Sequence, residues 1–522
     1  HAACPAGEDQ QDWFAKLQEG HAQDAWTSLV AANPLPGVTG RVCPHPCETA
    51  CNRAAIDGAL AIHNVERWLG DEAVSHDWKF PVETPDPDAP IVAIVGAGPA
   101  GLSAAYHALK HGLRARVFEA APEAGGLLRS AIPRTRLPRP VLDTEIERLL
   151  GLPGIDTTYR SRLGRDFSVD ELIADHSALL LAPGCQDGRE WDVRGAVPAD
   201  HHEGLSLLKE FMDHGQFPTA KRVIVHGGGN TAMDLCRLMK RSGVEEITLV
   251  TASGLPGPDT DSDDLINVVP RELEEALEEG VEIIPHATVN RLIMRGSKVT
   301  GAEIVSLRKE PGTDGRKRRV AFEGTERVMD VDMVIPCIGE RVDPEGLGRL
   351  LERGYLRPSD PWGTLDDTIY SLGDARGDRG TVAEAIGDGK RAIEAVAARL
   401  ANAEPLSDTR AEMPATGLNP IYYEHTPRAV APKLDVAART FDAEIEGDIG
   451  RTAAFAEAER CLSCGNCLAC DNCWTFCPDN AVIKTAELAT DGSHYLFDLD
   501  YCKGCGLCAH ECPTGYIQMR PE

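Results

Sequence analysis

The chain of 522 residues has the length of roughly three or four ordinary domains. Hydrophobic residues make up 42% and charged residues 26%, which is typical of a soluble globular protein. With 53 Lys and Arg against 82 Asp and Glu, the formal net charge is −29, which argues against nucleic acid and anionic membranes as partners. No segment predicts a transmembrane helix.

The 17 cysteines are concentrated near the two ends of the sequence. Four lie between residues 4 and 51, and ten lie between residues 461 and 512. A disulfide framework belongs to small secreted domains, and this long chain shows no secretory signal, so the grouped thiols predict metal ligands in a reducing, cytoplasmic compartment. Cys185, Cys236 and Cys337 stand alone and are expected to pack in cores.

Residues 1–80 are expected to form a small helical iron–sulfur domain. An amphipathic stretch follows Cys4, and Cys43, Cys47 and Cys51 then form a C-x3-C-x3-C pattern. Three thiolates from one loop, together with Cys4, would hold one [4Fe–4S] cluster.

An acidic, proline-rich linker at residues 81–90 leads to a first dinucleotide-binding unit. Residues 91–95 predict a buried parallel strand, and residues 96–101 follow with the G-x-G-x-x-G pattern of a strand-to-helix turn. Such a turn brings a pyrophosphate close to the backbone at a helix N-terminus, and an acid after the next strand accepts hydrogen bonds from ribose hydroxyls. The candidate residues are Gly96, Gly98, Pro99, Ala100, Gly101 and Glu119.

The same unit recurs after residue 222. A strand leads to Gly227, Gly228 and Gly229, a helix follows, and Ala232 replaces the third glycine, which the pattern allows. No carboxylate ends the next strand, and Thr251 stands in its place. The candidate residues are Gly227, Gly229, Asn230, Thr231 and Thr251, and two dinucleotide sites in one chain predict FAD plus a nicotinamide.

A third feature supports the flavin. The predicted strand at residues 368–372 ends in Gly373 and Asp374, and Thr381 and Val382 then open a helix. The Asp374 carboxylate could accept hydrogen bonds from the ribityl chain of the flavin.

The last part of the chain predicts a strap and a ferredoxin module. Residues 403–455 have weak periodicity and many prolines, whereas residues 456–522 carry the pattern C-x2-C-x2-C-x3-C-P twice. In two-cluster bacterial ferredoxins the fourth cysteine of each motif ligates the other cluster. One cluster is therefore assigned to Cys467, Cys470, Cys473 and Cys512, and the other to Cys502, Cys505, Cys508 and Cys477. Cys461 and Cys464 extend the series upstream and are treated as accessory residues.

Four motifs, VGAGPAGLSAAY, EAAPEAGGLLRSAIPRTRLP, GGGNTAMD and SLGDA, resemble the small chain of NAD(P)H-dependent glutamate synthase and its flavoprotein relatives over residues 1 to 400. The C-terminal module resembles the ferredoxin-like subunit of 2-oxoacid:ferredoxin oxidoreductases, and the fusion resembles the iron–sulfur flavoprotein that serves dissimilatory sulfite reductase. The resemblance implies an α/β fold class with two Rossmann-like domains, an N-terminal helical Fe–S domain and a C-terminal α+β ferredoxin domain. It implies an FAD domain at residues 91–218 and 341–402, interrupted by a nicotinamide domain at residues 219–340, and it adds Gly126, Leu127 and Arg129 to the FAD site.

The sequence departs from these relatives at two points. NADPH-using relatives carry an arginine pair after the second strand of the inserted domain, where this chain has Ala252 and Ser253, so NADH is expected rather than NADPH. Relatives hold two N-terminal clusters, but the upstream cysteines that supply three of their ligands are missing here, so one N-terminal cluster and three clusters in all are expected. Relatives place a Glu or Gln ligand where this chain has Glu66, but Cys51 is preferred because thiolate is the softer ligand.

These features predict an electron-transfer enzyme in which NADH reduces FAD and the flavin passes single electrons to iron–sulfur clusters. The cofactors carry the chemistry, so no catalytic side chain is expected, and neither nucleotide unit has the cysteine pair of a disulfide reductase. The resemblance favours a thiamine diphosphate-dependent 2-oxoacid oxidoreductase as the partner complex. Sulfite reductase, a glutamate synthase large chain, a bifurcating complex and a free ferredoxin are the alternatives, and a scaffold with purely structural clusters is the competing class.

Overall fold

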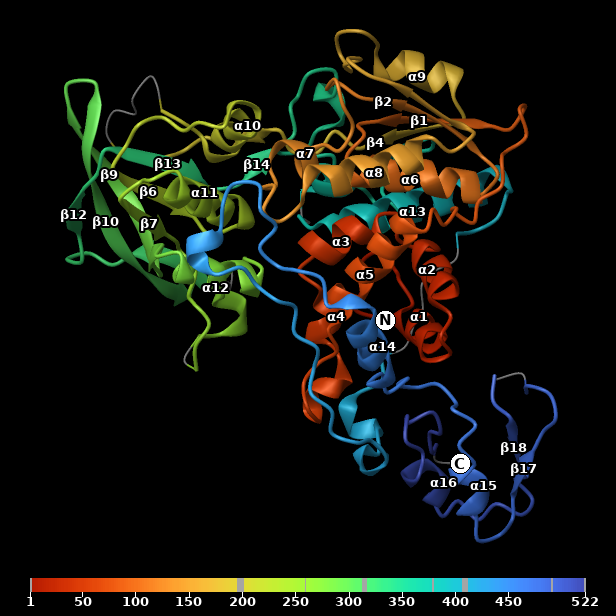
Figure 1. Ribbon diagram of the computed structural model, residues 1–522. Coiled ribbons are helices and arrows are strands. Elements are labelled where there is room, and N and C mark those ends of the chain that lie inside the picture. Colours follow the sequence, from red (N-terminus) through yellow and green to blue (C-terminus); the bar gives the residue numbers. More distant parts are fainter. Residues whose placement is uncertain are drawn as a thin grey trace. The chain divides into compact units, whose positions relative to one another are not determined.

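The computed structural model describes residues 2–194, 201–258, 260–311, 317–377, 380–405, 412–489 and 492–520. The chain divides into two compact units, whose elements are labelled in Figure 1. Unit 1 contains His1–Pro81, Leu406–Pro432 and Asp448–Glu522, and unit 2 contains Val82–Pro405 and Lys433–Gly447. Within the described residues, no helix is both long and apolar enough to cross a membrane.

A six-stranded sheet forms the first nucleotide-binding part of unit 2. Its order is β15-β16-β4-β1-β2-β3, and only the edge strand β15 is antiparallel to its neighbour. The sheet contains β1 (Ile91–Val95), β2 (Arg114–Phe118), β3 (Ile155–Thr158), β4 (Ala178–Leu181), β15 (Thr364–Asp366) and β16 (Ile369–Ser371). Its helices are α6 (Pro99–Lys110), α7 (Leu127–Ser130), α8 (Arg139–Leu150), α9 (Val169–Asp175) and α13 (Val382–Leu400).

Helices lie on both faces of this sheet, with α9 on one side and α6, α8 and α13 on the other (Figure 1). Because both faces are covered, the apolar run of β1 is buried, and Val92, Ala93 and Ile94 have no exposed surface. The carboxyl ends of β1, β2 and β16 meet at one edge of the sheet, which is where parallel α/β sheets bind ligands.

A second parallel sheet, ordered β13-β6-β7-β8, forms the other nucleotide-binding part of unit 2. It contains β6 (Arg222–Gly227), β7 (Glu246–Val250), β8 (Glu282–Ile284) and β13 (Met333–Cys337). Its helices are α10 (Gly204–His214), α11 (Asn230–Arg241) and α12 (Pro270–Glu278). An antiparallel sheet is formed by β9 (Ala287–Arg295), β10 (Lys298–Pro311), β11 (Lys317–Ala321) and β12 (Arg327–Asp330).

The second part is inserted into the first. The chain leaves the six-stranded sheet after β4 and returns to it with β15 and β16. The two crossing segments pair with each other as the short antiparallel strands β5 (Asp187–Gly188) and β14 (Glu340–Arg341). The predicted insertion of one Rossmann-like domain into another is therefore confirmed.

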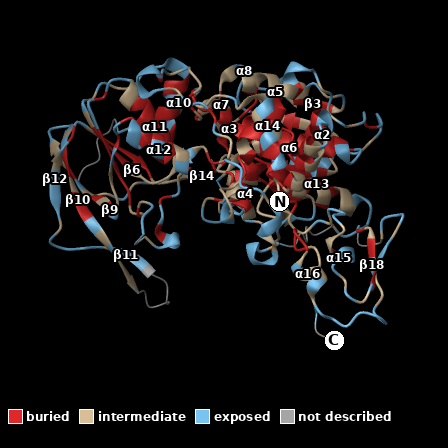
Figure 2. Cartoon of the chain, turned by 60° about the horizontal axis from the view of Figure 1, so that its bottom comes forward, coloured by how far each residue is buried: buried red, intermediate tan, exposed pale blue. Residues whose placement is uncertain are grey.

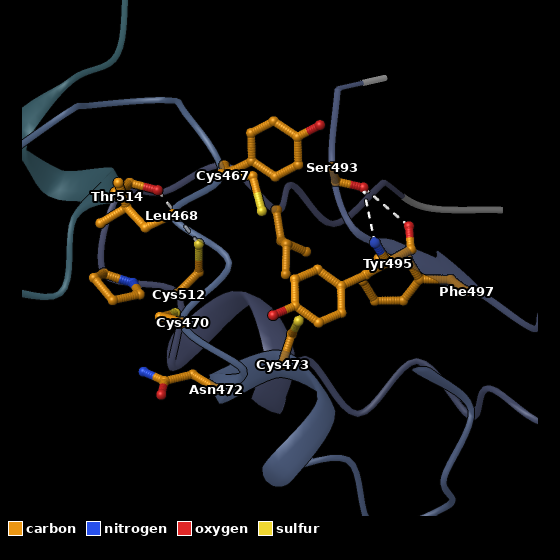
Figure 3. A pocket seen from close by; sticks show the side chains of 13 residues that line it. Cys467, Leu468, Cys470, Asn472, Cys473, Ser493, Tyr495, Phe497, Cys512 and Thr514 are labelled. Atoms are coloured by element: carbon orange, nitrogen blue, oxygen red, sulfur yellow. Dashed lines mark hydrogen bonds between the residues drawn. The ribbon is translucent and has the colours of Figure 1, made fainter. Parts of the chain in front are cut away.

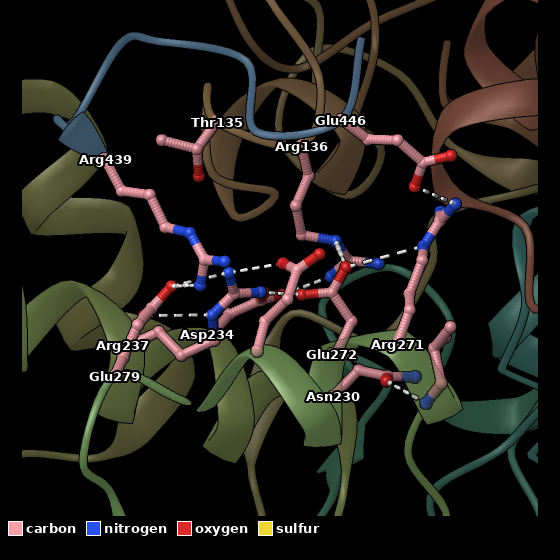
Figure 4. A network of polar contacts seen from close by, with 12 residues as sticks. Thr135, Arg136, Asn230, Asp234, Arg237, Arg271, Glu272, Glu279, Arg439 and Glu446 are labelled. Atoms are coloured by element: carbon pink, nitrogen blue, oxygen red, sulfur yellow. Dashed lines mark hydrogen bonds and ion pairs between the residues drawn. The ribbon is translucent and has the colours of Figure 1, made fainter. Parts of the chain in front are cut away.

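Buried ion pairs tie α11 to α12 and to the segment Lys433–Gly447 (Figure 4). The Arg237 guanidinium contacts Glu272 and lies 2.6 Å from Glu275 and 2.9 Å from Glu279. Arg439 donates to the same Glu279 carboxylate at 3.0 Å. These buried carboxylates are matched by cations, which is the condition under which charges are tolerated in a protein interior.

The helical part of unit 1 has a dense apolar core. Its elements are α1 (Gln10–Gln18), α2 (Ala22–Val30), α3 (Pro36–Val42), α4 (Pro46–Thr49), α5 (Ile62–Ser75) and α14 (Gly450–Glu459). Trp13, Trp26 and Trp68 are buried in this core together with Ala454 and Ala458 from α14. The sequence predicts no helix at α14, which begins inside the expected strap because its alanine-rich face completes this core.

The ferredoxin-like part of unit 1 contains α15 (Asn472–Thr475), α16 (Leu507–His510) and the hairpin strands β17 (Val482–Lys484) and β18 (Tyr495–Phe497). Among the described residues, its apolar core cluster is small and centres on Cys473, Val482 and Tyr495. Figure 2 shows mostly exposed and intermediate residues here, in contrast to the helical and nucleotide-binding parts. A core this small depends on bound inorganic groups for its stability.

Candidate redox and nucleotide-binding sites

The turn between β1 and α6 is shaped by glycine. Gly96 has φ of +101°, and a Cβ there would lie 2.2 Å from the carbonyl oxygen of Ala182. A Cβ on Gly101 would lie 1.9 Å from the carbonyl oxygen of Gly96, and one on Gly126 would lie 3.0 Å from the Cα of Gly98. The backbone at the start of α6 is thus free of side chains, as binding of a pyrophosphate requires.

Two carboxylates flank this turn. Glu119 follows β2, and its carboxylate accepts hydrogen bonds from the backbone N–H groups of Ala97 at 2.7 Å and Ala121 at 2.8 Å. Asp374 follows β16, and among the described residues its carboxylate has no hydrogen-bond donor. Burial raises the pKa of Asp374 to about 6, and the charges of Glu340, Glu384 and Asp388 add to the shift. A half-buried carboxylate without a donor fits a ligand that supplies hydroxyl groups, as the ribityl chain of FAD does.

The remaining residues predicted for the flavin lie around the same edge of the sheet. Gly373 has φ of +62° and lies against Ala100, since a Cβ there would be 3.1 Å from that of Ala100. Thr381 caps α13 through reciprocal hydrogen bonds with Glu384, and Val382 is the first residue of that helix. Leu127 is the first residue of α7. Arg129 is held by the carbonyl oxygen of Ala124 at 2.7 Å and by Asp143 at 2.6 Å.

The turn between β6 and α11 repeats this arrangement. A Cβ on Gly227 would lie 2.1 Å from the carbonyl oxygen of Cys337, whereas one on Gly229 would meet no atom within 4 Å. Asn230 begins α11 and accepts a hydrogen bond from the backbone of Val269 at 3.1 Å. The Thr231 hydroxyl donates to Glu340 at 3.3 Å, and Thr251 is buried directly after β7. The open space above Gly229 fits the approach of a dinucleotide to the helix N-terminus.

A charged group lies beside Ser253, just beyond the end of β7. Arg319 contacts the Ser253 hydroxyl at 3.5 Å and the Asp264 carboxylate at 2.7 Å. Lys309 lies 3.4 Å and His286 3.5 Å from Asp264. The sequence analysis did not find this group, because β10 and β11 bring its cations from far along the chain.

Three of the four predicted N-terminal ligands gather around Glu66. Burial and the carboxylate of Glu66 both raise the pKa of Cys43 and Cys47, and burial followed by Glu8 and Glu66 raises the pKa of Cys4 to about 12. Asn33 donates to Glu66 at 3.1 Å. These thiolates and Glu66 would balance the positive charge of bound iron. The group therefore fits one cluster.

Cys51, the fourth predicted ligand, interacts with other thiols. Its charge contributes to the raised pKa of Cys461, after burial, and to the raised pKa of Cys464. The largest charge contributions to the raised pKa of Cys4, Cys43 and Cys47, after burial, come from Glu66, Glu8 and one another. Glu66, the alternative ligand, is thus among the charges that act on all three of these thiols.

The ferredoxin-like part contains a cavity with about 410 Å³ of empty space, part of it open to solvent. It is lined by Cys467, Cys470, Cys473 and Cys512, the four residues predicted for one cluster (Figure 3). In the other predicted set, Cys477 and Cys508 pack against the same apolar cluster, and Cys502, Cys505 and Cys477, after burial, raise the pKa of Cys508. Within the described ranges, no group of cysteine, histidine and acidic side chains stands at the spacing of a single metal ion. A four-iron cluster is larger and takes ligands that stand farther apart.

Comparison with known proteins gives three matching families along the chain. The profile of pyridine nucleotide-disulphide oxidoreductases matches residues 90–394. The profile of dihydropyrimidine dehydrogenase domain II, which is a 4Fe–4S domain, matches residues 1–78. The 4Fe–4S dicluster profile matches residues 466–516. The chain belongs to the pyridine nucleotide-disulphide oxidoreductase family. It is an NAD(P)H-dependent flavin and iron–sulfur oxidoreductase with 4Fe–4S domains before and after its nucleotide-binding part.

Individual relatives agree with this family. The chain is 31% identical to the NADPH-Fe(3+) oxidoreductase subunit beta of Geobacter sulfurreducens, over 88% of this chain and 74% of that protein. It is 31% identical to the NADP(+)-dependent formate dehydrogenase subunit beta of Moorella thermoacetica, over 88% and 69%, and 29% identical to the glutamate synthase [NADPH] small chain of Escherichia coli, over 75% and 86%. Among solved structures, FprA of Mycobacterium tuberculosis in complex with NADPH has a TM-score of 0.52 and 17% identity, and the match covers 60% of this chain and 85% of that chain, which shows a shared fold.

Proposed function

We propose that this chain is an electron-transfer subunit that exchanges electrons between NAD(H) and a partner oxidoreductase through FAD and three [4Fe–4S] clusters. The observation that carries the proposal is the combination of two dinucleotide turns in unit 2 with two complete sets of four thiols in unit 1. A flavin accepts a hydride and releases single electrons, which is the conversion that joins a nicotinamide to iron–sulfur clusters.

The residues of the first nucleotide-binding part would bind and orient FAD. The start of α6 would supply backbone N–H donors to the pyrophosphate, since Gly96, Gly98 and Gly101 leave it free of side chains. Glu119, already fixed beside the turn, would accept hydrogen bonds from ribose, and Asp374 would accept them from the ribityl hydroxyls. Neither carboxylate needs to transfer a proton in this role.

We infer that the nicotinamide is NADH rather than NADPH. The cations near Ser253, Arg319 and Lys309, would attract the 2′-phosphate of NADPH if they were free. Asp264 engages both of them, and its negative charge opposes a second anion at the same place. The names of the Geobacter, Moorella and Escherichia relatives contain NADPH or NADP(+), so the preference of this chain needs a direct measurement of kcat/KM for both nucleotides.

For the N-terminal cluster we propose Cys4, Cys43, Cys47 and Glu66 as ligands. Glu66 has 3% of its surface exposed and shares its neighbourhood with all three thiols. A carboxylate ligand is harder than a thiolate, and the change in EPR signal after substitution of Glu66→Cys would report it.

The partner is proposed to be a thiamine diphosphate-dependent 2-oxoacid oxidoreductase, because the C-terminal module resembles the ferredoxin-like subunit of those enzymes. The module also exposes apolar side chains that a partner would cover. They include Leu468 (47% exposed), Leu488 (63%), Leu496 (51%), Leu499 (79%) and Tyr501 (68%). The relatives named above as subunits support a role within a larger complex but are named for other reactions.

An anaerobic pull-down of the native protein, followed by mass spectrometry of what stays bound, tests this assignment. Thiamine diphosphate-dependent subunits in the bound fraction would support it. A sirohaem sulfite reductase, a glutamate synthase large chain, a formate dehydrogenase or no partner would reject it and leave a general NADH:acceptor oxidoreductase. Reduction of the bound clusters by NADH, followed by visible absorbance, tests the electron path separately from the partner.

A further inference from the structure

A carboxylate lies in the connection that joins the two nucleotide-binding parts of unit 2. Glu340 follows β13 and belongs to β14, which pairs with β5 where the chain crosses between the parts (Figure 1). Its side chain is half-buried. Among the described residues, the carboxylate has one hydrogen-bond donor, the Thr231 hydroxyl at 3.3 Å, and no ion pair. A half-buried carboxylate with a single long hydrogen bond can still accept hydrogen bonds from a ligand.

Two cations act electrostatically on Glu340, but each is held by another group. The Nε of Arg189 donates to the Tyr355 hydroxyl at 3.1 Å. The ammonium group of Lys209 donates to the side-chain oxygen of Gln186 at 2.8 Å. Burial raises the pKa of Glu340. Since neither cation pairs with the carboxylate, a ligand that brings an N–H donor would stabilise it.

The backbone around Glu340 is held from both sides. Glu340 pairs with Gly188 across β14 and β5, and its carbonyl oxygen accepts a hydrogen bond from the Tyr355 hydroxyl at 2.7 Å. Gly339, between β13 and β14, has φ of +103°, a left-handed conformation that favours glycine. The carboxylate therefore has a fixed place, as a side chain that orients a ligand requires.

The strand order of the second sheet, β13-β6-β7-β8, indicates which half of a dinucleotide comes to Glu340. In parallel α/β sheets, a dinucleotide lies outside the carboxyl ends of the strands, at the point where the strand order reverses. Here the order reverses between β6 and β13, and Thr231 and Glu340 follow these two strands. The ribose of the adenosine belongs after β7, where Thr251 lies. The nicotinamide half therefore belongs on the side of β13, next to Glu340.

The same connection also reaches the proposed flavin site. The backbone N–H of Gln186 donates to the carbonyl oxygen of Arg341, the residue after Glu340, at 3.1 Å. The thiol of Cys185 donates to the carbonyl oxygen of Asp374 at 3.2 Å. These contacts link the backbone beside Glu340 to the flavin edge, while its side chain reaches the nicotinamide turn. A nicotinamide must meet the flavin ring to transfer a hydride, and Glu340 lies where the two sites adjoin.

We propose that the Glu340 carboxylate accepts a hydrogen bond from the carboxamide N–H2 group of the nicotinamide and so orients the ring toward the flavin. The proposal rests on the proposed binding of FAD and a nicotinamide nucleotide to unit 2. It applies to NADH and NADPH alike, because both carry the carboxamide. In this role Glu340 transfers no proton.

The test measures Kd for oxidised nucleotides with the full-length, flavin-loaded protein, by anaerobic titration calorimetry. The ligands are NAD+, its 3-acetylpyridine analogue, which lacks the N–H donors, and its nicotinic acid analogue, which carries a carboxylate instead. The native protein should bind the acetylpyridine analogue roughly tenfold more weakly than NAD+. It should bind the nicotinic acid analogue more weakly still, because two carboxylates repel each other. NADP+ and its matching analogues serve the same purpose if the native protein prefers them.

Two substitutions of Glu340 separate its role from a structural one. Glu340→Ala should bind NAD+ and the acetylpyridine analogue with equal affinity. Glu340→Gln should bind the nicotinic acid analogue roughly tenfold more tightly than the native protein does, because its amide N–H2 group can donate to the carboxylate of the ligand. A gain of binding cannot result from misfolding. The matched control is Glu352→Ala, which removes an exposed carboxylate from the segment that follows β14 and should keep the native order of the three ligands.

The proposal is overturned if Glu340→Ala keeps the native preference for NAD+ over the acetylpyridine analogue. It is also overturned if the native protein binds NAD+ and either analogue equally well, a comparison that needs no variant and so does not depend on how Glu340→Ala folds. Either result leaves the proposed function intact. A native protein that binds neither NAD+ nor NADP+ would overturn the proposed function together with this assignment.

Discussion

Asp374 is a half-buried carboxylate that lacks a donor among the described residues, and this predicts opposite effects on the empty and the FAD-bound protein. Asp374→Ala removes an uncompensated charge, so the apoprotein should gain thermal stability. The same change removes a charge-assisted hydrogen bond to FAD of about 1.5–3 kcal/mol, so the Kd for FAD should rise roughly tenfold to a hundredfold. Flavin fluorescence and thermal unfolding of the apoprotein measure both effects.

Asp367→Asn is the control for this prediction, because Asp367 is exposed before the N-terminal end of β16, away from the carboxyl-end edge, and should change neither quantity. An Asp374→Ala protein that binds FAD as tightly as the native protein would remove Asp374 from the site.

Asp264 predicts the nucleotide preference. In Asp264→Asn the two cations Arg319 and Lys309 lose the anionic partner that they share and become more available to a 2′-phosphate. The ratio of kcat/KM for NADPH to that for NADH should therefore rise about tenfold, which corresponds to about 1.4 kcal/mol. Steady-state kinetics with both nucleotides give the ratio, and a fall in it would contradict the role given to Asp264. Asp263→Asn removes an exposed carboxylate that contacts Lys309 but leaves Asp264 beside both cations, so it should raise the ratio less.

At this scale the sequence predicts contacts that lie within one turn and misses those that join distant segments. The glycines at 96, 98 and 101 follow from the steric needs of a single strand-to-helix turn, and the structure gives each of them a close backbone neighbour or an open approach. The contact of Arg319 with Ser253 spans 66 residues. It depends on where the β10–β11 hairpin lies, and a local pattern carries no information about that.

Among the elements, the pair α11 and α12 depends on a buried cation. Arg237→Ala would leave the carboxylates of Glu272, Glu275 and Glu279 buried with fewer cations, so unfolding should become easier by about 3–5 kcal/mol. Chemical unfolding followed by tryptophan and flavin fluorescence measures the loss. The control is Arg222→Ala, whose pairs with Asp330 and Asp332 are solvent-exposed and worth about 0–1 kcal/mol. Equal losses in the two variants would show that burial of Arg237 contributes nothing.

Hydrophobic periodicity predicted some of the helices and strands correctly and missed others. The strands β1 and β6 are short apolar runs before glycine-rich turns, β2 ends before Glu119 and β7 before Thr251, and their positions agree with the sequence. The helix α14 was missed because its residues, GRTAAFAEAE, carry a weak apolar pattern built on alanine. Alanine favours helix, but its small side chain marks a buried face only once a partner surface is known.

For the molecule as a whole, α14 joins the C-terminal segment to the N-terminal helical core. Ala454→Asp places a charge in that core, where Ala454 has no exposed surface, and should make residues 1–81 sensitive to protease and remove the N-terminal cluster. Ala456→Asp, on the exposed side of the same helix, should have neither effect. Limited proteolysis and EPR of the two proteins decide the matter. A protease-resistant Ala454→Asp protein with all its signals would show that α14 is dispensable to the core.

At the scale of the whole molecule, the sequence predicted which types of domain are present. It did not predict which stretches of the chain make up each compact unit. Two Rossmann-like domains with iron–sulfur domains before and after them were expected from motifs, and the family matches agree. That one compact unit draws on three separate stretches of chain was not expected. Composition and spacing describe neighbours along the chain, whereas this unit is formed by packing between its two ends.

The placement of α14 has a consequence for synthesis of the protein. The helical core made by residues 1–81 lacks one wall until residue 459 has left the ribosome. Several hundred residues are therefore translated while Trp13, Trp26 and Trp68 face an incomplete core, so this helical part is synthesised before the nucleotide-binding parts but cannot finish folding until after them. A chain terminated anywhere before α14 would contain an N-terminal helical part with an incomplete apolar core. Quality-control proteases would cleave such a product, because its core residues stay exposed.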